Sequence, residues 1–194
     1  MKATKSVCVY CGSSSRVADV YKQAAHALGE GLARRGVQVV YGGGRVGLMG
    51  IVADAAIAAG GRVVGIIPEH IQVLEVEHTA LSELHVVDSM HTRKRMMVDR
   101  SDAFVVLPGG LGTMDEAFEI LTWKQLGLHD KPVVLVDVDG YWRPLLALVD
   151  HMVEEGFCRE AHRALFRVVD RVEDVFETLA HEPAPRVEPE TRRL

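Results

Sequence analysis

Short apolar runs recur along the chain, and stretches with the three-to-four-residue spacing of a helix separate them. The apolar runs predict strands at 6–10, 37–41, 62–67, 84–87, 103–107, 132–136 and 166–169. The stretches between them predict helices at 18–35, 48–59, 90–100, 114–126, 142–155 and 172–179. The segment 69–83 shows no clean periodicity, so we expect a loop there.

The predicted strands show little alternation of apolar and polar residues, which is typical of strands that are buried on both faces. Because these strands alternate with helices, we predict an α/β fold: a single-domain, Rossmann-like, doubly wound parallel sheet with helices on both faces. The domain is expected to span residues 1–180. Residues 181–194 are rich in Pro, Glu and Arg, and we expect them to form a flexible tail.

Composition narrows the class of protein. The chain has 194 residues, 48% hydrophobic and 25% charged, which suits one soluble globular domain. A net charge of −5 does not indicate a nucleic-acid or membrane partner. No apolar run has the length of a transmembrane helix, and residues 1–5 lead into the first strand without the features of a signal peptide. We therefore expect a cytoplasmic protein.

The cysteines and histidines do not indicate a metal site. Cys8 and Cys11 form a C-x-x-C, but their odd separation on a strand places them on opposite faces, and no second cysteine pair exists. We expect both to be structural. The nine histidines show no ligand spacing, and no lysine stands in a recognisable pyridoxal-phosphate context. We therefore expect neither a metal nor a cofactor.

Three loops rich in glycine or serine follow predicted strands, at 12–15, 42–47 and 109–112. In a parallel sheet the carboxyl ends of the strands lie along one edge, where ligands bind near a switch in strand order. We therefore expect the three loops to converge on one site.

The loop at 109–112 has three glycines in four positions, which allows its backbone N–H groups to approach a bound group closely. The helix that follows favours an anion such as phosphate at its N-terminus, and Thr113 is a candidate cap. Because the Gly-Lys-Ser/Thr ending of a P-loop is missing, ATP hydrolysis is not indicated. Glu116 lies about one turn into the helix.

Glu116 has two interpretations. Thr113-x-x-Glu116 matches a capping box, in which the carboxylate only satisfies a backbone N–H group. Alternatively, Glu116 is catalytic, which the preceding glycines favour because a cap needs no glycine-rich approach. Spacing alone leaves both interpretations open, and one carboxylate could do both.

The second loop, Gly42-x-Gly44-x-x-Gly47, has the form of a dinucleotide fingerprint, with Glu69 near the position of a ribose-binding acid. However, it follows the second strand, whereas the usual fingerprint follows the first. The pattern therefore favours a contact with a nucleotide phosphate or ribose over a complete NAD site.

The helix predicted at 90–100 carries Arg93, Lys94 and Arg95 in succession. Such a run is often a solvated face, but neighbours on a helix point about 100° apart and cannot share one role. With Met90, Met97 and Val98 as the expected buried side, at most one or two of the basic residues would face the site. Arg93 would suit an anion or a leaving group through its planar fork of donors.

Two motifs together carry a family resemblance: Met90-His91-x-Arg93-Lys94, and Pro108-Gly109-Gly110-x-Gly112-Thr113-x-x-Glu116. The pair resembles the Lonely Guy (LOG) family, phosphoribohydrolases that activate cytokinins and were formerly labelled lysine decarboxylases. The similarity continues through most of the chain, at 11–14, 42–50, 121–123 and 155–157.

The resemblance implies hydrolysis of an N6-substituted adenosine 5′-monophosphate, such as a cytokinin riboside 5′-monophosphate, to the free base and ribose 5-phosphate. It implies that Glu116 is the catalytic carboxylate and Arg93 its partner. Expected substrate- or phosphate-binding residues, from the loops and the family pattern, are Ser13, Gly43, Gly44, Glu75, Lys94, Gly109, Gly110, Leu111, Gly112, Thr113, Met114, Asp115 and Thr122. Asp115 replaces the second Glu of many plant members, a mild departure.

Two other functions fit the same sequence: a nucleosidase acting mainly on AMP or other purine nucleotides, and a non-catalytic nucleotide-binding or carrier module in which Glu116 is a cap. The resemblance also implies a homodimer or a larger homo-oligomer. Apolar helix residues are candidates for that interface, namely Met96, Met97, Phe118, Ile120 and Leu121.

Overall fold

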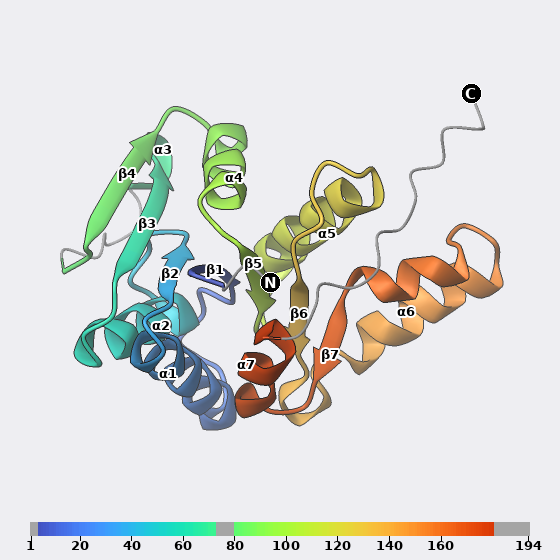
Figure 1. Ribbon diagram of the computed structural model, residues 1–194, viewed down its shortest axis with the longest axis horizontal. Helices are drawn as coiled ribbons and strands as arrows, with labels where there is room; N and C mark the ends of the chain where they lie inside the picture. The colour runs from blue at the N-terminus through green and yellow to red at the C-terminus, as the bar shows by residue number, and fades with distance from the viewer. Residues whose placement is uncertain (1–3, 73–79, 181–194) are drawn as a thin grey trace.

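A computed structural model of the chain describes residues 4–72 and 80–180. Its centre is a seven-stranded, entirely parallel sheet with strand order β4-β3-β2-β1-β5-β6-β7 (Figure 1). The strands are β1 (Ser6–Tyr10), β2 (Gln38–Tyr41), β3 (Val63–Pro68), β4 (Glu83–Val87), β5 (Ala103–Val106), β6 (Val133–Val136) and β7 (Arg167–Val169). Glu75 and the predicted tail at 181–194 lie outside the described residues.

Helices follow the strands as the sequence predicted. They are α1 (Asp19–Arg34), α2 (Gly47–Ala58), α3 (Glu69–Gln72), α4 (Met90–Asp99), α5 (Leu111–Gln125), α6 (Arg143–Glu154) and α7 (Val172–Ala180), with 3-10 turns η1 (Val138–Gly140) and η2 (Glu160–Leu165). Two elements differ from the prediction. The segment expected to be a loop begins with the short helix α3, and α5 begins at Leu111 rather than Met114.

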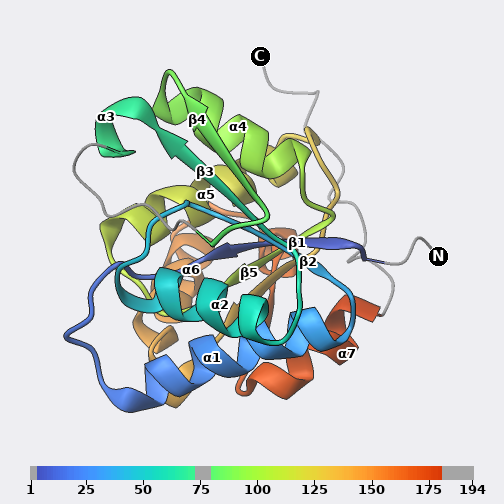
Figure 2. The same ribbon diagram turned by 90° about the vertical axis from the view of Figure 1, so that its left-hand side faces the viewer.

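The sheet is covered on both faces, which confirms the doubly wound prediction. Helices α1, α2 and α7 pack on one side around one buried cluster, and α4, α5 and α6 pack on the other side around a second (Figure 2). Cys8 belongs to the second cluster and Cys11 to the first, so the two thiols do lie on opposite faces. Both cysteines are buried and free.

The strand order switches between β1 and β5. The chain first steps outward from β1 to β4 and then returns to place β5 against the other side of β1. The three predicted loops therefore meet at one edge. The Gly12 N–H group donates to the Pro108 carbonyl at 3.0 Å, and the Leu48 N–H group donates to the Gly12 carbonyl at 3.0 Å.

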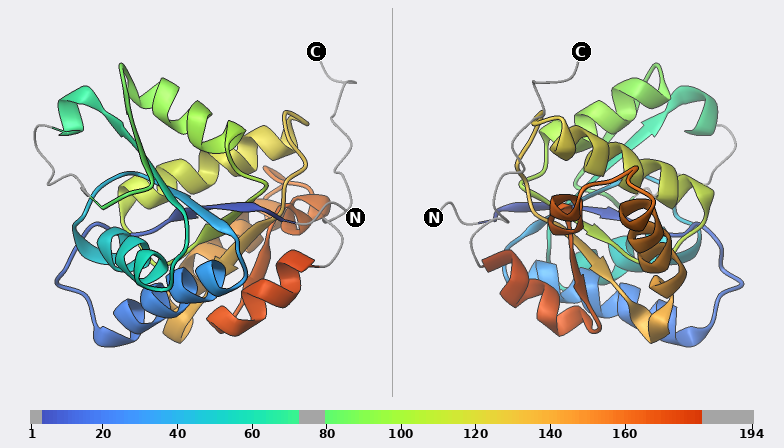
Figure 3. Two further views of the ribbon diagram at one scale, coloured as in Figure 1. Left: turned by 60° about the vertical axis from the view of Figure 1, so that its left-hand side comes forward. Right: turned by 90° about the vertical axis from the view of Figure 1, so that its right-hand side faces the viewer.

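Helices α4 and α5 lie side by side on the same face of the sheet in both views of Figure 3. Their N-terminal halves reach the edge where the glycine loops meet. Among the helices of the described residues, none is both long and apolar enough to cross a membrane.

Candidate active site

The start of α5 presents unbonded backbone donors at the switch point. Gly110 is the N-cap residue and has no side-chain cap. The first bond of the helix runs from the Met114 N–H group to the Gly110 carbonyl at 3.0 Å. Within residues 4–72 and 80–180, no acceptor bonds the N–H groups of Leu111, Gly112 and Thr113. Such a helix start favours an anion because both its N–H groups and its dipole point toward the ligand.

The capping-box interpretation of Glu116 was wrong. Because α5 begins at Leu111, Thr113 is the third residue of the helix and not its cap. Thr113 is buried, and its hydroxyl lies beside Gly109, where an added Cβ would be 2.1 Å from Thr113 Oγ1. The glycine at 109 therefore lets the loop pack closely against the helix. The Glu116 carboxylate does not cap the helix and bonds to Arg93 instead.

Glu116 forms a buried ion pair with Arg93. Arg93 Nη1 donates to Glu116 Oε1 at 2.6 Å, and each residue is only 9% exposed. Arg93 Nε also donates to the Ile66 carbonyl at 3.2 Å. A Cβ added at Gly42 would lie 2.2 Å from Arg93 Nη2, so the guanidinium fits only because position 42 is glycine. The predicted pairing of Arg93 with Glu116 thus exists, and it joins α4 and α5 to the ends of β2 and β3.

The Glu116 carboxylate is buried, so water screens its charge weakly when it is ionised. Burial raises the pKa of Glu116 above its ordinary value, and the charge and hydrogen bond of Arg93 oppose that shift without cancelling it. A charge that is poorly screened by water acts strongly on a neighbouring ligand. Such a carboxylate can stabilise positive charge that develops beside it.

Lys94 forms ion pairs with two other acidic residues of α5. Its Nζ lies 3.1 Å from Asp115 Oδ2 and 3.2 Å from Glu119 Oε2. Burial lowers the pKa of Lys94, but the hydrogen bonds and charges of these two carboxylates more than compensate and raise it above its ordinary value. Arg95 turns outward to Asp99. The prediction that the three basic residues diverge is therefore confirmed.

The burial of some apolar residues on α4 and α5 differs from the prediction. Met97 and Val98 are buried as expected, whereas Met90 is 36% exposed because it is the first residue of α4, at the end of the buried stripe. Met97 and Ile120 are fully inside the second core cluster, so their candidacy as interface residues was wrong. Phe118 remains 37% exposed on α5.

The other predicted site residues fall into an exposed group and a buried group. Near the switch point, Leu111, Gly112 and Asp115 are exposed, and Ser13 is exposed beside Gly47. Away from open solvent, Gly43 and Gly44 are buried, and Gly43 packs against Gly65 of β3. Met114 is partly buried and packs on the second core cluster.

Thr122 is not brought to the ion pair. It is exposed on α5, about 9 Å along the helix axis from Glu116. Its predicted contact with a nucleotide therefore stays a prediction.

Two residues of this site were missed from the sequence. Glu119 was not considered, although it stands four residues after Asp115 and so shares its helix face. Tyr141, in the turn between η1 and α6, donates from its hydroxyl to the Gly109 carbonyl at 2.6 Å. No local motif marks that contact, because it joins two loops that are 32 residues apart.

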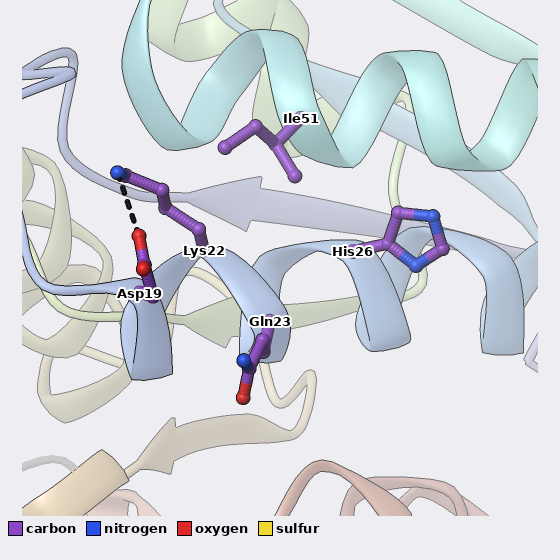
Figure 4. A pocket seen from close by; sticks show the side chains of 5 residues that line it. All are labelled: Asp19, Lys22, Gln23, His26 and Ile51. Atoms are coloured by element: carbon purple, nitrogen blue, oxygen red, sulfur yellow. Dashed lines mark hydrogen bonds and ion pairs between the residues drawn. The ribbon is translucent and has the colours of Figure 1, made fainter.

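A separate shallow groove of about 470 Å³ lies between α1 and α2 (Figure 4). It is lined by Asp19, Lys22, Gln23, His26 and Ile51. Because α1 and α2 cover the opposite face of the sheet from α4 and α5, this groove does not contain the Arg93–Glu116 pair.

Comparison with solved structures shows the fold. The chain is similar to a molybdenum cofactor binding protein from Rippkaea orientalis, with a TM-score of 0.70 and 22% identity over 93% of this chain and 97% of that chain. It is also similar to the molybdenum cofactor carrier protein of Chlamydomonas reinhardtii, with a TM-score of 0.69 and 21% identity over 94% of this chain and 100% of that chain.

Comparison with curated proteins shows the family. A cytokinin riboside 5′-monophosphate phosphoribohydrolase of Rhodococcoides fascians is 48% identical over 170 residues, which cover 87% of this chain and 86% of that protein. One from Arabidopsis thaliana is 47% identical over 153 residues, covering 79% of this chain and 72% of that protein. The family model described as "Possible lysine decarboxylase" matches residues 49–179. The chain therefore belongs to this family, the Lonely Guy phosphoribohydrolases once described as possible lysine decarboxylases.

Proposed function

We propose that this protein hydrolyses the N-glycosidic bond of an N6-substituted adenosine 5′-monophosphate, releasing the free base and ribose 5-phosphate. The observation that carries the proposal is the buried pair between Arg93 of α4 and Glu116 of α5, the helix whose first N–H groups meet no acceptor among the described residues. Its family relatives are named for this activity on cytokinin riboside 5′-monophosphates. One helix thus offers a phosphate-binding end and a carboxylate about one turn further along.

The chemistry follows from how this bond breaks. As the bond between the base nitrogen and the anomeric carbon lengthens, positive charge builds on the ribose. The Glu116 carboxylate stabilises that charge, either directly or by activating the attacking water. The water oxygen bonds to the anomeric carbon, and a proton reaches the departing base nitrogen. Phosphate held at Gly110 to Thr113 contributes binding energy that orients the ribose for this step.

Arg93 acts mainly by orienting Glu116 in this scheme. Its Nε and Nη1 atoms already donate to the Ile66 carbonyl and to Glu116. Its Nη2 lies against Gly42. Two hydrogen bonds and the close approach to Gly42 restrain the guanidinium. This restraint supports a role in positioning Glu116 better than a role in donating a proton to the leaving group.

Lys94 contributes to the same scheme indirectly, through the packing of α4 against α5. Its Nζ is shared between Asp115 and Glu119, which favours holding α4 against α5. Ser13, Gly43, Gly44, Glu75 and Thr122 remain predicted nucleotide contacts.

The test is product release by the purified protein. We expect N6-isopentenyl adenosine 5′-monophosphate to yield isopentenyladenine and ribose 5-phosphate in equal amounts, measured by chromatography. The same assay with AMP compares substrates: faster turnover of AMP would assign a purine nucleotide nucleosidase instead. Nucleotide binding without release of either product would overturn the enzyme assignment and leave a carrier function.

We also propose that the protein acts in the cytoplasm as a homodimer or larger assembly. The assembly is supported by exposed apolar residues on and just after α5, namely Phe118, Leu126 and Leu128. Analytical ultracentrifugation of the wild type and of Leu126→Glu tests it. Dissociation of the variant is expected, and a monomeric wild type would contradict the proposal.

A further inference from the structure

The loop that precedes α5 is fastened from across the sheet edge by one side chain. Tyr141 follows β6 and η1, and its hydroxyl donates to the Gly109 carbonyl at 2.6 Å. The Cα of Gly109 is itself enclosed, because an added Cβ would meet Thr113 Oγ1 at 2.1 Å and the Gly12 backbone at 2.8 Å. The next residue is different: a Cβ at Gly110 would have nothing within 4 Å.

On the Gly110 side, therefore, no neighbouring atom in the direction of a side chain holds the peptide that joins Gly109 to Gly110. Glycine also has wide conformational freedom, so this peptide could rotate as a unit. In a trans peptide the C=O and N–H bonds lie in one plane and point in opposite directions. By holding the Gly109 carbonyl, Tyr141 therefore fixes the direction of the Gly110 N–H group, which points away from the tyrosine. That group is the first in the series of donors at the start of α5.

Tyr141 is 38% exposed, and two aromatic contacts position its ring. Its ring makes edge-to-face contacts with Tyr21 of α1, at 5.7 Å between centroids, and with Trp142, at 4.9 Å. The buried Asp137 carboxylate accepts from the backbone N–H group of Trp142 at 2.6 Å.

The turn that leads to Tyr141 is conformationally unusual. Asp139 has φ 54° and is the single non-glycine residue with positive φ in the part of the chain that the structure describes. Gly140 follows with φ 72°. Left-handed backbone is unfavourable for a residue with a side chain and is often retained where a turn must aim a group. Here the group that the turn aims is the Tyr141 hydroxyl.

We infer that Tyr141 is a positioning residue for phosphate recognition: its hydroxyl orients the Gly109–Gly110 peptide so that the Gly110 N–H group donates to the 5′-phosphate of the nucleotide. The inference rests on the proposed function only for the identity of the phosphate. It assigns the loop after β6 a part in substrate binding. That loop carries none of the residues expected to touch the nucleotide.

Tyr141→Phe isolates the hydroxyl, because the ring and its aromatic contacts are kept. A hydrogen bond to a charged phosphate is worth enough that its misalignment weakens binding by about tenfold. We expect the inhibition constant of ribose 5-phosphate to rise by about that factor, while that of the free base isopentenyladenine stays within about twofold of wild type. The KM for the nucleotide should rise with it, while kcat changes little.

Tyr21→Phe is the matched control. Tyr21 belongs to the same aromatic contact, but no hydrogen bond of its hydroxyl occurs among the described residues. This variant should keep both inhibition constants. An unchanged ribose 5-phosphate constant in Tyr141→Phe would overturn the inference, and so would equal weakening of both products, because that indicates a general structural defect.

Calorimetric binding of AMP and adenosine separates this inference from the proposed activity, because it needs no turnover. If the wild type releases no product, the proposed hydrolysis fails, yet a selective loss of AMP over adenosine binding in Tyr141→Phe would still support the positioning role. Equal losses for both ligands, or none for AMP, would overturn it.

Discussion

Glu116 occupies a position of α5 that packing alone would give to an apolar residue. The buried residues of this helix follow one stripe, made of Thr113, Glu116, Ala117, Ile120 and Lys124. A carboxylate in such a stripe is unfavourable unless it is paired, and Arg93 supplies the partner. The helix thus retains a buried charge where a methyl-bearing side chain would fit, which is characteristic of a functional residue.

Replacing Glu116 with Gln should separate chemistry from binding. The amide keeps the shape of the side chain and can still accept from Arg93, but it carries no charge to stabilise the ribose in the transition state. We expect kcat to fall by about 10²- to 10³-fold, with affinity for ribose 5-phosphate within about threefold of wild type. Steady-state kinetics and product inhibition measure both. Normal turnover by Glu116→Gln would contradict the role given to the carboxylate.

The pH dependence of the reaction should report the balance of forces on Glu116. Burial raises its pKa and Arg93 lowers it, so removing the guanidinium leaves burial less opposed. In Arg93→Met the Glu116 pKa should therefore rise further above the ordinary glutamate value. Because the ionised form is needed, residual activity should fall off at a higher pH than in wild type as the solution is acidified.

Carboxyl ¹³C NMR titration of the labelled protein follows the same pKa without turnover. Arg100→Met is the control, since Arg100 lies on the same chain segment and pairs instead with the distant Glu83. A Glu116 titration that stays in place when Arg93 is removed would show that the guanidinium does not set the charge state.

At the scale of elements, the site depends on how α4 lies against α5. Arg93 and Lys94 leave α4 in different directions, and each meets acidic residues of α5. The contact thus has two parts: the ion pair of Arg93 with Glu116, for which we propose a catalytic role, and the ion pairs of Lys94 with Asp115 and Glu119. The two parts are electrostatically linked, because the charge of Lys94 also lowers the pKa of Glu116.

Lys94→Met tests the ion pairs of Lys94, with Arg95→Met as its control. Lys94 is 11% exposed at its side chain, whereas Arg95 is 67% exposed and pairs within its own helix. Because solvent screens Asp115, which is 61% exposed, we expect Lys94→Met to lower the free energy of unfolding by only about 1 kcal/mol. It should also raise the Glu116 pKa. Arg95→Met should change stability by less than about 0.5 kcal/mol. Urea unfolding measures both, and equal effects would contradict the distinction.

The elements were predictable because their signals are local. Buried strands such as β1 appear as apolar runs, and the glycines that follow β1, β2 and β5 mark the edge where the loops meet. The start of α5 was misplaced because Thr113 has the chemistry of a cap, while the true N-cap, Gly110, offers no side chain. The divergence of Arg93 from Lys94 followed from helix geometry. Their particular partners did not, because the interhelical contact depends on how two helices pack.

At the scale of the whole molecule, the topology assembles a site from segments that are far apart in sequence. The return of the chain from β4 to β5 places the loop after β5 beside the loop after β1. The same return carries α4 over the sheet to meet α5. Tyr141 reaches Gly109 only because β6 lies next to β5. The meeting of the glycine loops followed from the predicted parallel sheet, but no local pattern indicates the contact of Tyr141 with Gly109, and for that reason Tyr141 was missed.

The packing of α5 also leaves one charge that the proposed mechanism does not use. Lys124 is only 7% exposed at the far end of the buried stripe. Among the described residues, the groups that act on its ammonium do so through charge alone, without a hydrogen bond from it to a carboxylate. Burial, and then the nearby charge of Arg167, lower the pKa of Lys124 to about 8, while Asp130 opposes the shift. This lysine should therefore make the stability of the whole fold depend on pH.

The sign follows from proton binding in the two states. Below pH 8 the ammonium is charged both in the folded protein and in the unfolded chain, where it titrates near 10.5, so the folded state bears the full cost of burying it. That cost is about 3 kcal/mol, at about 1.4 kcal/mol for each pKa unit. It declines as the pH rises from 8 toward 10.5, because the folded state releases its proton first.

Lys124→Met should therefore stabilise the protein at neutral pH and lose that advantage in alkali. We expect a gain of about 1–3 kcal/mol in the free energy of unfolding at neutral pH, somewhat reduced by imperfect packing of the new side chain. Lys22→Met is the control, because Lys22 forms an exposed pair with Asp19 and should change stability by less than about 0.5 kcal/mol at any pH. Urea unfolding across the pH range measures the difference. A gain that persists unchanged above the ordinary lysine pKa would show that hydrophobic packing, and not the buried charge, is its source.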